Sequence, residues 1–167
     1  MGKKEIDWKE YISYGMTSKT YDDKHIYMGD IDRNIEDKDL LKIINDLFEL
    51  WDLTHIHLIG STNGYNLISL DKISLELIHT INRETEHIDQ QFNEYNYGRK
   101  YYTLRIGEDK KYITCFTNNN HKNFDPERSN GHRVLLNNLY NIRIPKDPLF
   151  DDYEQFELVR YTDIKER

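Results

Sequence analysis

Two aspartates stand two positions apart at the end of a short apolar segment. The segment 25–32 reads His-Ile-Tyr-Met-Gly-Asp-Ile-Asp, and its β-branched and aromatic residues are typical of a β-strand. Residues i and i+2 of a strand project from the same face, so Asp30 and Asp32 are expected to lie side by side. Hard divalent cations take oxygen ligands of this kind, and a cation relieves the repulsion between the two carboxylates. The pair therefore indicates a cation site, and the alternative is a strand end whose acids face water.

A small-residue turn forms the second candidate feature. Ser61, Thr62, Asn63 and Gly64 are followed by Tyr65, and Asn-Gly favours a tight hairpin. Backbone N–H groups at such a tip, together with the Ser and Thr hydroxyls, can bind an anion. The alternative is an ordinary hairpin turn.

A basic and aromatic segment follows later in the chain. From Arg99 to Lys111 there are five basic residues against two acidic ones. On a strand over 100–106, alternate residues share a face, which would align Arg99, Tyr101, Thr103 and Arg105. Such a face suits nucleic-acid phosphates and base stacking, and Lys100 and Tyr101 are the expected nucleic-acid contacts. The alternative is a solvated edge whose tyrosines pack on the core.

The elements that must position these residues follow from periodicity. Apolar residues at spacings of three and four predict a helix over 40–51, and Ser74 is a candidate N-cap for a second helix carrying Leu75, Ile78 and Ile81. Strands are expected at 25–32, 55–60, 65–70 and 100–106, with a hairpin partner of the last at 112–116. The order is βαββαβ, an α+β fold of the ferredoxin-like or RRM-like type with an added antiparallel hairpin. In that topology the first and third strands are the central pair and lie side by side. Asp89 falls between the second helix and the basic strand, where it is either a third metal carboxylate or a surface residue.

Together these features resemble the archaeo-eukaryotic primase superfamily over about residues 25–116. Met28-Gly29-Asp30-Ile31-Asp32 is similar to the family's Asp-hydrophobic-Asp motif, and Ser61-Thr62-Asn63-Gly64-Tyr65 to its Ser-containing hairpin. Ile88-Asp89 supplies a hydrophobic-Asp pair, and Tyr101 to Ile106 resembles the following Arg-containing strand. The family's hairpin leads to a His that contacts the nucleotide, whereas this chain has Asn66 there.

The resemblance implies a primase-type palm and a minimal primase-like nucleotidyltransferase that primes or extends nucleic acid in DNA replication. Two Mg²⁺ or Mn²⁺ ions would be held by Asp30, Asp32 and Asp89. Nucleoside triphosphate would be bound by the hairpin residues, by Asn66 and by two arginines, Arg99 and Arg105. A single-stranded DNA template is the implied partner. Asn66 in place of His is expected to weaken triphosphate binding, although an amide still donates a hydrogen bond. Replication proteins are expected to supply modules that 167 residues leave no room for, an arrangement that suits a virus or mobile element.

Two other interpretations remain open. His55 and His57 form a His-hydrophobic-His pair, which rolling-circle replication-initiator endonucleases use beside a nucleophilic Tyr, and Tyr97-Gly98-Arg99-Lys100 fits their Tyr-x-x-Lys string. The expected topology puts this pair on an edge strand, away from Asp30, and does not put Tyr97 on a helix. The third interpretation is a catalytically degenerate protein that binds single-stranded nucleic acid or a partner. His132 is expected in a loop.

Composition bounds these hypotheses. The 167 residues carry 23 Lys and Arg against 30 Asp and Glu, a net charge of −7, which argues against coating nucleic acid by bulk charge. The length predicts a single domain over 1–167, in which residues 117–167 form a C-terminal extension packing on the core. No apolar run is long enough for a membrane span, so no membrane partner is expected. One cysteine, Cys115, excludes an intramolecular disulfide, and a cytoplasmic location is expected.

Overall fold

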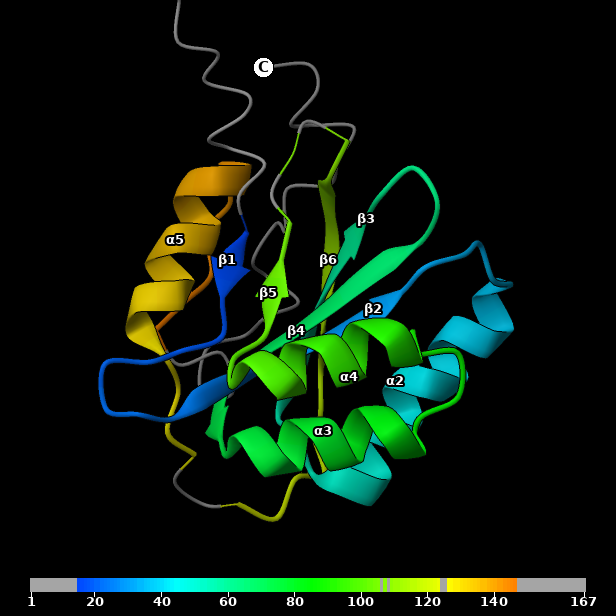
Figure 1. The fold of residues 1–167 in the computed structure, drawn as a ribbon. Helices are drawn as coiled ribbons and strands as arrows, with labels where there is room; N and C mark the ends of the chain where they lie inside the picture. The colour runs from blue at the N-terminus through cyan, green and yellow to red at the C-terminus, as the bar shows by residue number, and fades with distance from the viewer. Residues whose placement is uncertain (1–14, 106, 108, 124–125, 147–167) are drawn as a thin grey trace, which may run out of the picture.

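A computed structural model describes residues 15–105, 107, 109–123 and 126–146 of the 167-residue chain. The fold is α+β, with helices and two antiparallel sheets (Figure 1). The elements in order are β1 (Met16–Thr17), β2 (His25–Ile31), α2 (Asp37–Trp51), β3 (His55–Gly60), β4 (Tyr65–Ile73), α3 (Leu75–Glu84), α4 (Gln90–Arg99), β5 (Thr103–Leu104), β6 (Lys111–Thr117) and α5 (Asn130–Tyr140). In this part of the chain, none of the helices combines the length and apolar character that crossing a membrane requires.

A four-stranded sheet with the order β2-β4-β3-β6 forms the centre of the fold. β3 and β4 form the expected hairpin, and β2 and β4 are the expected neighbours, with Asp30 directly opposite Asn66. The expectation that β2 is one of the two central strands was wrong, because β2 lies at the edge of this sheet. The short strands β1 and β5 pair in a separate sheet. That small sheet adjoins β2, since the Ile26 amide donates to the Ser18 carbonyl and the Ser18 amide to the Tyr102 carbonyl.

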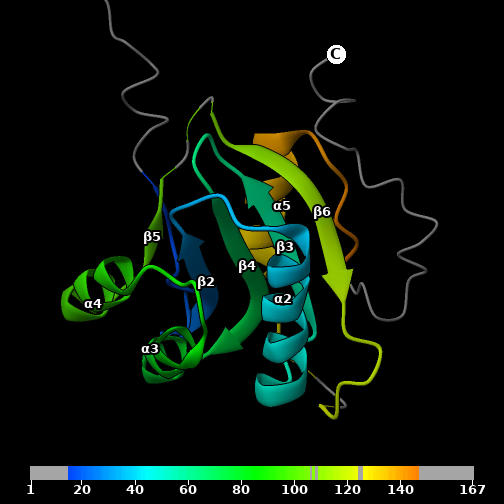
Figure 2. The ribbon, with the colours of Figure 1, turned by 90° about the vertical axis from the view of Figure 1, so that its right-hand side faces the viewer.

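Helices cover both faces of the central sheet. Figure 2 shows α2 and α5 on opposite sides of it. α2 is amphipathic, and its buried residues recur at helical spacing at Leu40, Ile43, Ile44 and Leu47. α3 lies beside β2, where the Tyr27 hydroxyl donates to Asn82 Oδ1 at 2.8 Å. Successive side chains of a strand point to opposite faces of the sheet. Because Tyr27 points toward α3, Met28 and Asp30 point toward the opposite face.

The predicted helices and most of the predicted strands are confirmed. The predicted helix over 40–51 is α2, and Ser74 does cap α3, accepting a hydrogen bond from the Leu77 amide. The strand expected at 112–116 is β6, but its expected partner was wrong. β6 pairs with β3, whereas β5 pairs with β1.

The segment from Asp89 to Arg105 differs most from expectation. The strand predicted at 100–106 is only β5, because Lys100 ends helix α4 in the left-handed conformation. Arg99 is therefore helical and does not alternate with Tyr101 along a strand. Residue 106 lies outside the described residues. His132 was expected in a loop and instead lies in α5, buried, where its Nε2 contacts the Thr17 carbonyl at 2.7 Å.

Candidate functional site

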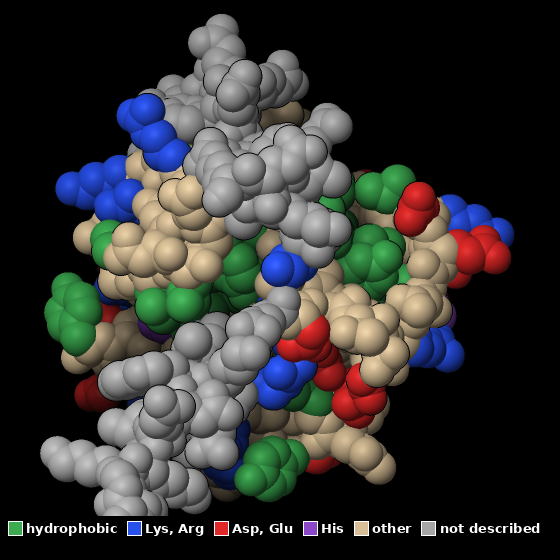
Figure 3. Space-filling model, turned by 90° about the horizontal axis from the view of Figure 1, so that it is seen from above, with side chains coloured by type: hydrophobic (Ala, Val, Ile, Leu, Met, Phe, Trp, Pro, Cys, Tyr) green, Lys and Arg blue, Asp and Glu red, His purple; other side chains and the backbone are tan. Residues whose placement is uncertain are grey.

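A cavity of about 300 Å³ opens where β2 ends beside the β3–β4 hairpin. Figure 3 views the molecule from above, and acidic and basic side chains lie next to each other near the centre of that face. The cavity gathers residues from five segments of the chain. They are Asp30, Asp32, Ser61, Thr62, Asn63, Asn66, Phe92, Thr103, Leu104, Arg105, Asp109 and Lys110.

Asn66 joins an acid to a base at the floor of this cavity. Its Nδ2 donates to Asp30 Oδ1 at 2.7 Å, and its Oδ1 accepts from Lys110 Nζ at 2.6 Å. Asn66 is itself buried. An amide can serve both neighbours at once because it carries a donor and an acceptor on one rigid group. The cross-strand register, which sets Asn66 opposite Asp30, fixes this geometry.

Burial shifts the pKa values of Asp30 and Lys110 in opposite directions. Burial raises the pKa of Asp30 from 3.8 to about 6, and the negative charges of Asp32 and Asp89 add to the rise, while Lys110 opposes it. Burial also lowers the pKa of Lys110, while the Asp30 charge raises it. A carboxyl group with a pKa near 6 still ionises at neutral pH, and a bound cation would favour its charged form.

The hairpin tip is held against the end of β2 by a glycine. A Cβ on Gly64 would lie 1.8 Å from the Ile31 carbonyl oxygen and 2.9 Å from the Arg33 nitrogen, so no other residue fits without moving the backbone. The turn closes through a 2.9 Å bond from the Ser61 amide to the Gly64 carbonyl. This close approach brings the Ser61–Asn63 segment to the same cavity as Asp30 and Asp32.

Asp32 and Asp89 differ in how they relate to the cavity. Asp32 is exposed, just beyond β2, and lines it. Asp89 is the N-cap of α4, and its Oδ1 accepts from the Gln91 amide at 2.9 Å and the Phe92 amide at 3.3 Å. The Asp89 amide donates to the Asp30 carbonyl at 2.8 Å, so the start of α4 is fixed beside Asp30. Asp89 is near enough to affect the pKa of Asp30, but it does not line the cavity.

The donor chemistry fits a divalent cation held by two carboxylates. Asp30, Asp32, Asn66 and the hairpin hydroxyls offer oxygen atoms, which Mg²⁺ and Mn²⁺ prefer. Mg²⁺ in particular is commonly held by one or two carboxylates, with phosphates and water completing its shell. Among the described residues, no group of three or more His, Cys, Asp or Glu side chains is arranged as a complete protein cage for a metal.

Two arginines of the basic segment lie in different places. Arg105 lines the cavity and forms a bidentate pair with Asp109, from Nη2 to Oδ1 and Oδ2 at 2.8 and 2.7 Å. Arg99 instead lies between the rings of Tyr95 and Tyr101, 4.7 and 4.6 Å from their centroids. Arg99 borders a neighbouring hollow that shares Phe92, Thr103 and Arg105 with the cavity.

The other two expected nucleic-acid contacts lie close to Arg99. The Tyr101 ring is also approached by Lys19 Nζ at 5.1 Å from its centroid, so cations lie over it from two residues. Lys100 is exposed, and its Nζ lies 5.9 Å from the centroid of the Tyr97 ring. Cation–π contacts of this kind leave an aromatic surface beside the cavity with positive charge around it.

The histidine pair lies inside the core. β3 runs between β4 and β6, so the expectation that the pair lies on an edge strand was wrong. His55 and His57 are fully buried, and burial lowers the pKa of His55 to about 3 and that of His57 well below its ordinary value. His55 Nε2 accepts from the Leu70 amide, and His57 Nδ1 contacts the Tyr112 hydroxyl.

Tyr97, the third residue of the endonuclease hypothesis, belongs to a different part of the fold. It does lie on a helix, α4, contrary to the expectation from sequence, and its ring stacks on His79 of α3 at 4.0 Å. By the sheet register the histidines share the face of Asp30, whereas α3 contacts the opposite face through Tyr27. The structure does not bring Tyr97 and the two histidines together.

Four residues that line the cavity are not predicted as site residues from the sequence: Phe92, Leu104, Asp109 and Lys110. Of these, Lys110 bonds directly to Asn66. The sequence does show a turn at 107–110 before a strand. A lysine at the end of that turn lines the cavity because β6 pairs with β3. The sequence favoured a hairpin with the preceding strand, which would have carried Lys110 elsewhere.

Comparisons with family models, with curated proteins and with solved structures found no significant match for this chain.

Proposed function

We propose that the chain is a minimal primase-like nucleotidyltransferase that acts on nucleoside triphosphates with a divalent cation. The observation that carries the proposal is the single cavity lined by Asp30, Asp32, the Ser61–Asn63 turn, Asn66 and two cationic side chains. Carboxylates for a cation and donors for phosphates therefore converge from segments that are distant in sequence. The primase-type palm is part of the same proposal, supported by the β2–β4 pairing that sets Asp30 opposite Asn66.

Each residue takes a role from its position. Asp30 and Asp32 hold the cation, Mg²⁺ or Mn²⁺, which when bound neutralises phosphate charge and lowers the pKa of an attacking hydroxyl. The Ser61 and Thr62 hydroxyls and the hairpin amides bind the triphosphate. Lys110 adds positive charge at the phosphates, and Arg105 does so when it exchanges its partner Asp109 for a phosphate oxygen. Asp89 acts through the position of α4 and the electrostatic field at Asp30.

The test is incorporation of a labelled nucleotide onto a primed or unprimed single-stranded template, with Mn²⁺ or Mg²⁺. Asp30→Asn and Asp32→Asn keep the shape of each side chain and remove its charge. We expect each to lower incorporation by at least a hundredfold, because the cation loses half of its carboxylate ligands. Asp37→Asn on α2, an exposed aspartate outside the cavity, is the matched control and should leave incorporation unchanged. Incorporation that survives both cavity variants would contradict the proposal.

A second candidate is a non-catalytic binding protein, and one observation favours it. Lys110 donates to Asn66 beside Asp30, so an ammonium group supplies positive charge near this carboxylate without a metal ion. This candidate predicts affinity for single-stranded DNA that a chelator does not change and that Tyr101→Ala reduces. The absence of incorporation in the wild-type chain, together with chelator-independent binding, would select this candidate over the first.

A further inference from the structure

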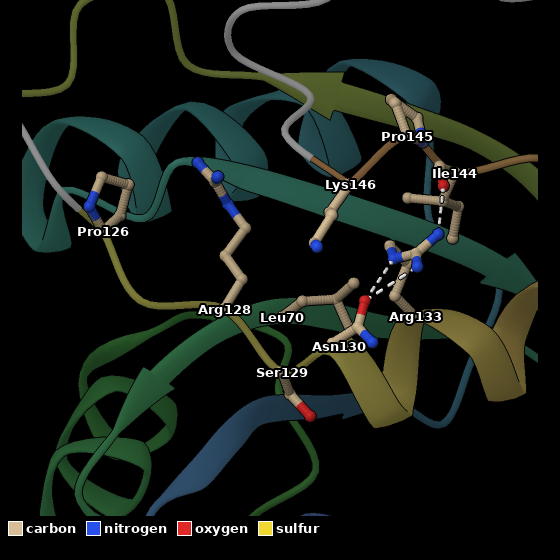
Figure 4. A pocket seen from close by; sticks show the side chains of 9 residues that line it. All are labelled: Leu70, Pro126, Arg128, Ser129, Asn130, Arg133, Ile144, Pro145 and Lys146. Carbon is tan, nitrogen blue, oxygen red and sulfur yellow. Dashed lines mark hydrogen bonds between the residues drawn. The ribbon is translucent and has the colours of Figure 1, made fainter.

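A second cavity, of about 390 Å³, lies where the start of α5 meets the segment that follows this helix. Figure 4 shows it at close range. Three of its lining residues are basic, Arg128, Arg133 and Lys146, and among the residues that the structure describes neither Asp nor Glu lines it. This concentration of positive charge is notable in a chain with a net charge of −7. We refer to these three residues and the space between them as the basic hollow.

Contacts with Thr54 and Asp71 fix the side chain of Arg128. Its Nη2 donates to Thr54 Oγ1 at 3.1 Å, and its Nε lies 3.5 Å from Asp71 Oδ1. Both members of this ion pair are largely buried, and Asp71 also accepts from the Thr54 amide at 2.7 Å. The guanidinium is thus fixed at the wall of the hollow before any ligand arrives, which lowers the entropic cost of binding.

Arg133 is held by neutral acceptors. Its Nε and Nη2 donate to Asn130 Oδ1 at 3.0 and 2.8 Å, and its Nη1 donates to the Ile144 carbonyl at 3.1 Å. No carboxylate within the described ranges pairs with it. In Figure 4 the side chain of Lys146 lies between the two arginines. Lys146 is exposed, so its ammonium is accessible from solvent.

The basic hollow is separate from the candidate site. The two cavities share no lining residue. Leu70 of β4 lines the basic hollow and Asn66 of β4 lines the candidate site, and four residues of strand span about 13 Å. They lie on the same side of β4, since residues i and i+4 of a strand face the same way.

We propose that the basic hollow binds a phosphate group, supplied either by a nucleic-acid strand or by a free polyphosphate. Two guanidinium groups and an ammonium group that line one space offer positive charge to the several oxygens of a phosphate. The apolar wall formed by Leu70, Ile144 and Pro145 leaves room for a sugar or base beside it. This inference goes beyond the proposed function and does not depend on catalysis at Asp30.

The test is the salt dependence of binding by the full chain, measured by fluorescence anisotropy with a labelled single-stranded oligothymidine. Each phosphate contact on a single strand contributes about 0.7 to the slope of log K against log salt. We expect Lys146→Gln and Arg133→Gln each to lower the slope by about 0.7 and to weaken binding about fivefold at 0.1 M salt. Lys38→Gln, an equal charge change on α2, is the matched control and should leave the slope unchanged.

Additional probes and variants distinguish a nucleic-acid phosphate from a free polyphosphate, and loss of charge from loss of folding. Tripolyphosphate that binds the wild type and not the two variants, without any oligonucleotide effect, supports the hollow as a site for free polyphosphate. Arg133→Lys keeps the charge and should retain most of the slope, which distinguishes lost charge from lost folding. Unchanged slopes in Lys146→Gln and Arg133→Gln with both probes would overturn the proposal. So would poly-glutamate that competes while tripolyphosphate does not, because the site would then select acidic peptides. The slope measurement requires no nucleotide incorporation, so the proposed function can fail in the incorporation assay of Asp30→Asn while the lowered slopes of Lys146→Gln and Arg133→Gln still support this site.

Discussion

At the scale of single residues, Asn66 determines what the candidate site can do. It donates to Asp30 and accepts from Lys110, so one side chain couples an acid and a base. A histidine, which the primase resemblance leads one to expect here, could be cationic and bind phosphate directly. With asparagine, the positive charge comes from Lys110 instead. The sequence predicted Asp30, Asp32 and the hairpin as neighbours but could not predict Lys110, because that depends on which strand β6 joins.

The first prediction concerns Asp30 and pH. Burial raises its pKa from 3.8 to about 6, so between those values the folded chain holds a proton that the unfolded chain releases. The free energy of unfolding therefore falls as pH rises from about 4 to about 6, and the loss persists above that range. Asp30→Asn removes this penalty. We expect it to be more stable than the wild type by about 1–3 kcal/mol at pH 7 and by little at pH 4, as measured by urea denaturation.

The control for this prediction is Asp46→Asn on α2, which removes one surface carboxylate. A stability difference between Asp30→Asn and the wild type that stays constant from pH 4 to pH 7 would contradict the assigned pKa. A gain in stability combined with loss of nucleotide incorporation would show that Asp30 is kept for function at a cost to the fold.

At the scale of elements, hydrophobic periodicity explains which helices could be predicted. α2 buries four aliphatic residues at helical spacing and was predictable. α4 buries Asn93 and Asn96, which satisfy neighbouring polar groups and give no apolar pattern. Asn93 Oδ1 accepts from the Tyr102 hydroxyl at 2.5 Å, and Asn96 Oδ1 accepts from the Thr103 amide at 2.9 Å. Apolar periodicity cannot predict a helix whose buried residues are asparagines.

The second prediction concerns the N-cap of α4. Asp89 accepts hydrogen bonds from the Gln91 and Phe92 amides, and asparagine can do the same at an N-cap. If Asp89 acts as a cap, Asp89→Ala loses about 1 kcal/mol of unfolding free energy while Asp89→Asn loses little. Nucleotide incorporation by Asp89→Asn should stay within a few-fold of the wild type.

The same pair of variants tests the competing role. A direct metal ligand requires the negative charge, so incorporation abolished in Asp89→Asn at unchanged stability would make Asp89 a third catalytic carboxylate. Thermal denaturation and incorporation measured on both variants separate the two roles, because the cap depends on an acceptor oxygen and the metal depends on charge.

At the scale of the whole molecule, β4 of the central sheet contributes to both cavities, and buried polar side chains lie on the same sheet. His55 and His57 lie on the face of the sheet that carries Asp30, and Asp71 links Thr54 to Arg128 at the wall of the basic hollow. Thr54, His55, Asp71 and Arg128 form one group of buried hydrogen bonds that ties β3 to β4 and to the segment before α5. From the sequence, a cation-binding role for the histidines beside a nucleophilic Tyr97 was an open alternative, because a His-x-His pattern does not reveal whether a strand is an edge or an interior strand.

The third prediction concerns acid and this core. His57 is fully buried, and its Nε2 has no hydrogen-bond partner in the described part of the chain. Burial is the main cause that lowers the pKa of His57, and electrostatic repulsion from His55 lowers it further. Below pH 6.5 the unfolded chain protonates this histidine while the folded chain does not, so acid favours unfolding. His57→Asn keeps a polar atom near Tyr112 and cannot titrate. The stability advantage of the wild type over His57→Asn should therefore shrink by up to about 1.4 kcal/mol for each pH unit below 6.5. Because Asp30 titrates in both proteins, its opposite effect cancels in the difference. A difference that stays constant from pH 7.5 to pH 4.5 would mean that water reaches His57, and that the polar core is more open than the buried side chains indicate.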